Sequence, residues 1–192
     1  SQRPHPSRLG STLTHPYITT DYSEALIELI TPPHLDVEAL LQDMTEIHQF
    51  TYRNLGGELL WVNSMPCILH GDDSISIANY GTSNVGRMKT IYRIGLAHRY
   101  GKLMQTIAGI HFNFSIGNDF WRSWRAICRS TVPLRDFKSE GYFGLVRNVY
   151  RYGWLIPYLF GASPAVCRTF LDGRNHHLKL LGDSTYYLPY AT

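Results

Sequence analysis

The clearest hydrophobic pattern of the chain lies between residues 37 and 55, where apolar residues recur every three or four positions. That spacing is typical of a helix with one apolar face. Asp36 can cap the first helical amide groups, and Gly56-Gly57 can end the helix, which we expect to run to about Asn54. We assign this helix a structural role and no chemistry.

A second helix is predicted over residues 87–100, in a segment where glycines, aromatic residues and cations alternate. Ser83 or Asn84 can cap its beginning, and Gly101 can end it. A further helix is predicted over residues 139–154, where apolar residues again follow the helical period.

Two faces of the helix over residues 87–100 suggest a ligand. Tyr92 and Leu96 are four residues apart and share one face, while Lys89 and Arg93 share a neighbouring face. An aromatic and aliphatic wall beside paired cations suits a small anionic ligand that has an apolar part. A packed helix with a basic outer rim explains the same pattern, so both interpretations stay open.

The alternation of residues 25–31 predicts a β-strand that Pro32-Pro33 ends. Glu28 would then share a face with Leu26 and Ile30. A carboxylate among aliphatic side chains must be ion-paired, protonated or bound to a metal, because an isolated buried charge is too costly in free energy. Glu28 could equally be an ordinary carboxylate on an edge strand.

A second strand is predicted over residues 102–115. One of its faces is mostly apolar and would be covered by a helix layer. The other face carries Gln105, His111 and Asn113 at even spacing, as the floor of a polar cavity would. Exposure to solvent explains these polar positions as well.

The composition is that of one globular domain, with 192 residues of which 44% are hydrophobic and 17% charged. A net charge of +3 without a dense run of Lys and Arg does not indicate nucleic-acid binding. The most apolar run is too short, and too often broken by proline and glycine, to span a membrane. Three widely spaced cysteines indicate a reduced, cytoplasmic protein, although Cys128 and Cys167 could form a redox pair.

Five segments resemble the proteobacterial glutamate–cysteine ligases, in the same order and over essentially the whole chain: residues 9–32, 64–67, 80–101, 104–115 and 158–167. The resemblance implies that residues 1–192 are the N-terminal portion of the catalytic domain. It also implies an α+β fold, in which an antiparallel sheet forms part of a funnel like that of glutamine synthetase. Helices would pack on the outer face of that sheet.

The reaction that the resemblance implies is the first step of glutathione synthesis. ATP would phosphorylate the side-chain carboxylate of glutamate, and the amine of cysteine would then displace phosphate to give γ-glutamylcysteine. The partners are therefore the small molecules glutamate, cysteine and ATP, without nucleic acid or membrane. The implied cofactor is Mg²⁺, which offsets the charge of the phosphate oxygens. The sequence does not indicate an oligomeric state.

Matching positions imply roles for individual residues. Glu28 and His111 match metal ligands of the family, and we expect them to converge on one divalent cation. Asp21 lies in a matching loop that supports the metal or the cysteine subsite. Arg93 is a candidate contact for an anionic group, and no residue is assigned a catalytic role. Four residues match the wall of the cysteine pocket: Tyr22, Tyr92, Leu96 and Gln105.

Two features depart from the family pattern. Nothing matches the opening strand G-[LIM]-E-x-E, which supplies two acidic metal ligands, and the sequence stops at Thr192, before further residues that bind ATP and the metal. We therefore expect negligible ligase activity from the isolated chain, because it offers Mg²⁺ too few carboxylates. The alternative is a catalytically incompetent fragment, or a binding module of the same fold.

Overall fold

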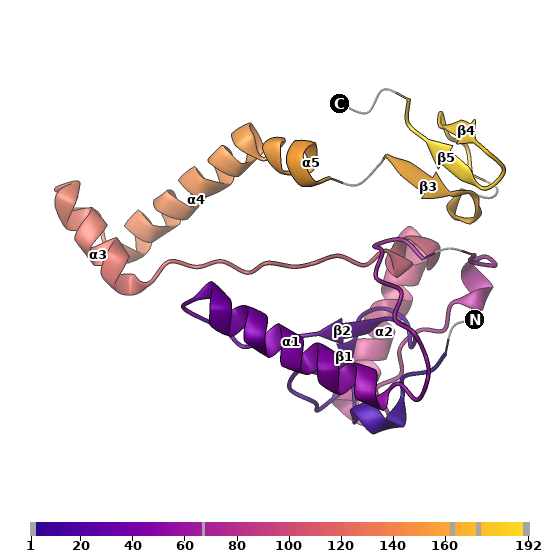
Figure 1. Cartoon of the computed structure of the whole chain (residues 1–192). Coiled ribbons are helices and arrows are strands. Elements are labelled where there is room, and N and C mark those ends of the chain that lie inside the picture. Colours follow the sequence, from indigo (N-terminus) through magenta and orange to yellow (C-terminus); the bar gives the residue numbers. More distant parts are fainter. Residues whose placement is uncertain (1–2, 67, 162–163, 172–173, 190–192) are drawn as a thin grey trace. The chain divides into compact units, whose positions relative to one another are not determined.

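The computed structural model describes residues 3–66, 68–161, 164–171 and 174–189. The chain divides into two compact units (Figure 1). Unit 1 comprises Ser1–Gly109 and Ala165–Thr192, and unit 2 comprises Ile110–Pro164. Helices and small antiparallel sheets are both present, so the α+β expectation is confirmed. A single sheet curved into a funnel stays a prediction, because the described sheets have two and three strands.

The first sheet is a hairpin of β1 (Ile18–Thr20) and β2 (Ile27–Leu29), with Thr19 opposite Glu28. Ile27 and Leu29 pack against a small core beside α1, whereas Glu28 is exposed. The expectation that Glu28 must be neutralised because it lies among aliphatic side chains is therefore wrong. Side chains alternate between the two faces of a strand, so the two neighbours of Glu28 point to the covered face and Glu28 points to the other. Its carboxylate can therefore stay hydrated.

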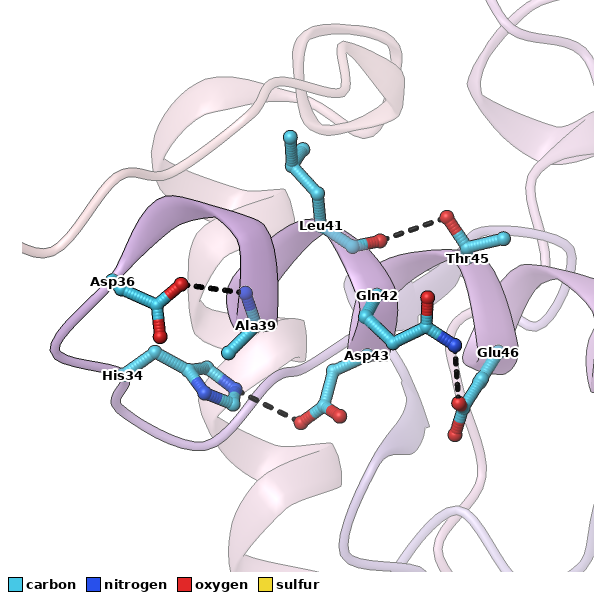
Figure 2. Close-up of polar contacts among 8 residues, drawn as sticks. All are labelled: His34, Asp36, Ala39, Leu41, Gln42, Asp43, Thr45 and Glu46. Atoms are coloured by element: carbon cyan, nitrogen blue, oxygen red, sulfur yellow. Dashed lines mark hydrogen bonds and ion pairs between the residues drawn. The ribbon is translucent and has the colours of Figure 1, made fainter.

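Helix α1 (Val37–Asn54) begins where the sequence predicted, because the Asp36 carboxylate accepts a hydrogen bond of 3.0 Å from the Ala39 amide. Figure 2 shows this cap beside a second polar contact, in which His34 Nε2 lies 2.9 Å from Asp43 Oδ2. The contact ties the chain before the helix to its second turn. The helix contacts β2 and the short 3-10 helix η1 (Ser7–Leu9), so it covers one side of the hairpin.

Helix α2 (Asn84–Tyr100) confirms the second predicted helix. Ser83 Oγ accepts a hydrogen bond of 3.2 Å from the Gly86 amide, and Gly101 ends the helix at a φ of 77°, a conformation that favours glycine. Packed against α2 is the 3-10 helix η3 (Leu103–Thr106).

The strand predicted over residues 102–115 is wrong. Its first part forms η3, and no described residue pairs with residues 107–115 as a strand. Asp72 in the 3-10 helix η2 (Asp72–Ser74) accepts hydrogen bonds from the amides of Lys102 at 3.0 Å and Leu103 at 2.9 Å. These contacts favour a turn, because the two amides are no longer available to a neighbouring strand.

A second core of unit 1 joins its two stretches of sequence. Its buried members are Tyr22, Leu69, Ile75, Leu103 and Phe170. Beside it lies an antiparallel sheet with the order β3-β5-β4, formed by β3 (Ala165–Cys167), β5 (Thr185–Tyr187) and β4 (Lys179–Leu181). The 3-10 helix η4 (Arg168–Phe170) brings Phe170 into the core.

Unit 2 is helical, with α3 (Asn118–Ile127), α4 (Leu134–Tyr152) and α5 (Leu155–Phe160). Helix α4 confirms the helix predicted over residues 139–154, but it begins earlier. Trp121 of α3 is buried, and a Cβ atom at Gly141 of α4 would lie 2.4 Å from its ring. Cys128 carries a free, exposed thiol, and whether it pairs with Cys167 stays a prediction. No helix in the described part of the chain is long and apolar enough to cross a membrane.

Candidate functional site

The candidate site is built around the turn that follows β1. Tyr22 is only 2% exposed, and its hydroxyl has no hydrogen-bond partner among the described residues. Asp21 is exposed and precedes it. Main-chain contacts to residues 77 and 78 hold the turn in place: Tyr22 O accepts a hydrogen bond of 3.0 Å from the Ala78 amide, and Ser23 pairs with Ile77.

Two side chains bind the carbonyl groups at the start of this turn. Tyr80 Oη donates to Thr20 O at 2.6 Å and lies 3.3 Å from Asp21 O. Arg93 Nε donates to Asp21 O at 2.6 Å, and its Nη2 lies 3.4 Å from Thr20 O. The Arg93 guanidinium also lies over the Tyr80 ring, 4.6 Å from the centroid. Helix α2 and the hairpin turn are therefore fixed to each other through Arg93.

The electrostatic setting keeps the Tyr22 hydroxyl protonated. Burial raises its pKa, the negative charge of Asp72 raises it further, and the positive charge of Arg93 opposes them. A phenol with a raised pKa stays neutral at physiological pH and can donate a hydrogen bond. The unsatisfied hydroxyl is thus available to a polar ligand.

The other residues predicted for the cysteine pocket lie on α2 and η3. Leu96 is half-buried and packs against the core that contains Tyr22. Tyr92, one turn earlier, is 65% exposed. Gln105 is half-buried in η3, which packs against α2. The structure therefore places Tyr22, Arg93 and Leu96 in one region of unit 1, and whether Tyr92 and Gln105 face a ligand stays a prediction.

The three predicted metal ligands all lie at exposed positions. Asp21 and Glu28 lie at two exposed positions of the β1–β2 hairpin, and His111 is an exposed residue of unit 2. Within the described ranges, no three His, Cys, Asp or Glu side chains form a group that could hold a metal ion. The convergence of Glu28 and His111 on a cation stays a prediction.

Sequence reasoning missed two residues of this region. These are Tyr80, the first residue of the segment 80–101 that resembles the family, and Asp72. Both act on main-chain groups far along the chain, and such groups carry no sequence pattern. The only available signal was the position of Tyr80 beside Gly81 and Gly86, where a close approach of backbones was to be expected.

The family model and the similar proteins all point to one family. The family model for glutamate–cysteine ligase matches residues 1–192. The glutamate–cysteine ligase of Hahella chejuensis is 58% identical over 193 residues, which cover 100% of this chain and 37% of the relative. That of Yersinia pseudotuberculosis is 51% identical, over 98% of this chain and 36% of the relative.

Solved structures agree. A crystal structure of the glutamate–cysteine ligase of Francisella tularensis in complex with AMP matches with a TM-score of 0.87 and 39% identity, over 100% of this chain and 37% of that protein. A bifunctional glutathione synthetase from Pasteurella multocida matches with a TM-score of 0.78 and 32% identity, over 90% of this chain and 22% of that protein. The chain spans little more than a third of the curated relatives' length. It belongs to the glutamate–cysteine ligase family.

Proposed function

We propose that this chain is part of an enzyme that joins the side-chain carboxylate of glutamate to the amine of cysteine, with ATP as the second substrate. The observation that carries the proposal is the match of the family model to all of residues 1–192. The relative from Francisella tularensis that binds AMP supports a nucleotide as a substrate. We place the reaction in the cytoplasm, where the thiol of cysteine stays reduced.

The chemistry proceeds in two steps. A carboxylate oxygen of glutamate attacks the terminal phosphorus of ATP, so that ADP leaves and a γ-glutamyl phosphate forms. The cysteine amine then attacks the acyl carbon, the C–O bond to phosphate breaks, and inorganic phosphate leaves with the amine's proton passing to a base or to water. The work of the protein is mainly to position the two reactants and to balance charge.

We assign the cysteine side of the site to unit 1. The buried Tyr22 hydroxyl can donate a hydrogen bond to the substrate, and Tyr92 and Leu96 would supply an aromatic and aliphatic wall for the thiol group. Gln105 would supply an amide. The support for this assignment is that Tyr22 and Leu96 share one core, and that Arg93 ties α2 to the turn that carries Tyr22.

A divalent cation such as Mg²⁺ would supply charge balance for the phosphate groups. Among the described residues, no group of three His, Cys, Asp or Glu side chains occurs that could hold this cation. Asp21, Glu28 and His111 remain the proposed ligands, and no step is derived through the metal.

A chimeric enzyme tests the proposal. The matching 193-residue segment of the Hahella chejuensis relative would be replaced by this chain, and γ-glutamylcysteine would be quantified with glutamate, cysteine and ATP. We expect ATP-dependent product from the chimera and none from the 192-residue chain alone. A well-folded chimera that binds cysteine but forms no product would instead support the non-catalytic binding module.

A further inference from the structure

We propose that Tyr80 and Arg93 are paired positioning residues, which hold the Thr20–Asp21 backbone so that Asp21 and Tyr22 are presented to the reactants. The inference rests on the proposed function, because it names how the cysteine side of that site is held in place. It assigns Arg93 to the protein backbone, and not to an anionic group of the substrate. We call the two side chains with their two carbonyl groups the turn clamp.

The first step of the argument is the number of contacts to two adjacent carbonyl groups. Thr20 O and Asp21 O each lie within hydrogen-bonding distance of both Tyr80 and Arg93, at 2.6 to 3.4 Å. Thr20 Oγ1 in turn donates to Tyr80 Oη at 3.0 Å. The phenol therefore donates to and accepts from the same residue, which fixes the direction of its hydroxyl.

The second step concerns burial. Tyr80 is 4% exposed and Thr20 is 1% exposed, so the hydrogen bonds between them are shielded from water. Arg93 reaches this buried contact from α2 and stacks on the Tyr80 ring, and Lys89 Nζ lies 4.8 Å from the same ring centroid. A lost partner in such a place leaves a buried polar atom unsatisfied, which is more costly than a lost surface contact.

The third step is the state of the Arg93 guanidinium. Its Nε and both terminal nitrogens already donate to main-chain oxygens, including Lys89 O at 3.1 Å. These contacts engage three of the five N–H groups that an arginine offers. The backbone and the Tyr80 ring thereby fix the plane of the guanidinium. This arrangement suits a residue that holds the turn in place.

The fourth step links the clamp to function. Arg93 follows Tyr92 and precedes Leu96 by less than one turn, so all three move with α2. The carbonyl of Asp21 belongs to the turn that carries Tyr22. The turn clamp therefore sets the separation between the two parts of the proposed cysteine subsite. A small displacement of reacting groups can cost up to about a hundredfold in rate.

Hydrogen exchange of the 192-residue chain tests the clamp without catalysis. The Asp21 amide donates to Leu26 O and the Ala78 amide donates to Tyr22 O, both at 3.0 Å, so these two amides report on the turn. We expect Tyr80→Phe to lower their protection about tenfold, because the turn loses a buried hydrogen bond. Unchanged protection in this variant would overturn the proposal.

Steady-state kinetics of the chimera test the link to the reaction. We expect Tyr80→Phe and Arg93→Met each to raise KM for cysteine at least about tenfold while KM for ATP stays within about twofold. The double variant should be little worse than either single one, because both remove the same unit. Arg93→Lys should restore part of the loss, since a cation over the Tyr80 ring is retained.

A matched control lies on the same helix. Arg99 also lies over a tyrosine ring, that of the exposed Tyr100, at 5.9 Å, so Arg99→Met should leave both KM values unchanged. If Arg93→Met alone raised KM and Tyr80→Phe had no effect, Arg93 would be a substrate contact and the clamp would be refuted. An inactive parent chimera would refute the proposed function and the catalytic part of the clamp, whereas hydrogen exchange would still decide the structural part.

Discussion

Gly86, in the first turn of α2, offers a sharp test of how this helix meets the Tyr80 segment. A Cβ atom at this position would lie 2.5 Å from Tyr80 O and 2.9 Å from Gly81 O. Both atoms belong to the main chain, so they cannot move aside as the end of a flexible side chain can. Gly86→Ala should therefore push the start of α2 away from the backbone of Tyr80 and Gly81.

Two opposing effects decide the magnitude. Alanine is favoured over glycine inside a helix by about 1 kcal/mol. Forcing one additional carbon atom into a well-packed contact costs about 1–3 kcal/mol. We expect the second effect to dominate at Gly86, because the distances are far below ordinary contact, and unit 1 should lose about 1 kcal/mol of stability.

The matched control is Gly95→Ala on the same helix, where a Cβ atom would meet nothing within 4 Å. Only the helix preference acts there, so this variant should gain about 0.5–1 kcal/mol. The assay is native-state hydrogen exchange of the α2 amides in the 192-residue chain, which reports the free energy of opening of unit 1 alone. The reasoning is refuted if Gly86→Ala protects these amides as much as Gly95→Ala does.

Four other outcomes follow from the described contacts. Tyr22→Phe removes a buried hydroxyl without a partner, so urea unfolding should show unit 1 unchanged or up to about 1 kcal/mol more stable at pH 7. Burial raises the pKa of Tyr22 in the folded protein above the value of about 10 in the unfolded chain, so ionisation of Tyr22 leaves the free energy of unfolding unchanged below about pH 10 and lowers it as the pH rises through the folded-state pKa. The loss of stability at alkaline pH should therefore be smaller in Tyr22→Phe. Gly141→Ala would collide with Trp121 and should lower the melting temperature of unit 2, seen by tryptophan fluorescence, whereas Gly144→Ala should not. Asp36→Ala should cost about 1 kcal/mol in the hydrogen-exchange stability of α1.

The helices could be predicted from the sequence because their signals are local. Asp36 and Ser83 cap α1 and α2 as expected, and Gly101 ends α2 with a positive φ. Each signal involves residues within one helical turn, so no knowledge of the rest of the fold is needed. The helix α3 carries weaker signals, because its N-cap is Gly117 without a side-chain hydrogen bond.

The strand over residues 102–115 could not be judged in this way. Alternation describes which side chains would share a face, but a strand also needs a neighbour that satisfies its amide and carbonyl groups. Asp72, far back in the chain, binds the amides of Lys102 and Leu103, and nothing in the alternation predicts that contact. At the first two residues of the segment, the error therefore comes from a long-range competitor for the backbone amides.

The sequence predicted which residues belong to the candidate site better than it predicted how they contact one another. The resemblance directed attention to Asp21, Tyr22 and Arg93, and the structure places these three together. It could not indicate that Arg93 binds carbonyl groups, since every residue has one. For the same reason, the role of Tyr80 emerges only from the structure, in which Tyr80 and Arg93 both bind the carbonyl groups of the turn.

The split of unit 1 into two stretches, described above, has a consequence for biosynthesis. Phe170 and Thr169, which follow unit 2 in the sequence, contact Leu69 and the core around Tyr22. During translation the ribosome must release all of unit 2 before unit 1 can close its second core. Loop closure costs rise only slowly with the length of the intervening segment. Homologous proteins should therefore tolerate insertions or deletions within unit 2 far better than changes at the two junctions where the chain leaves and re-enters unit 1.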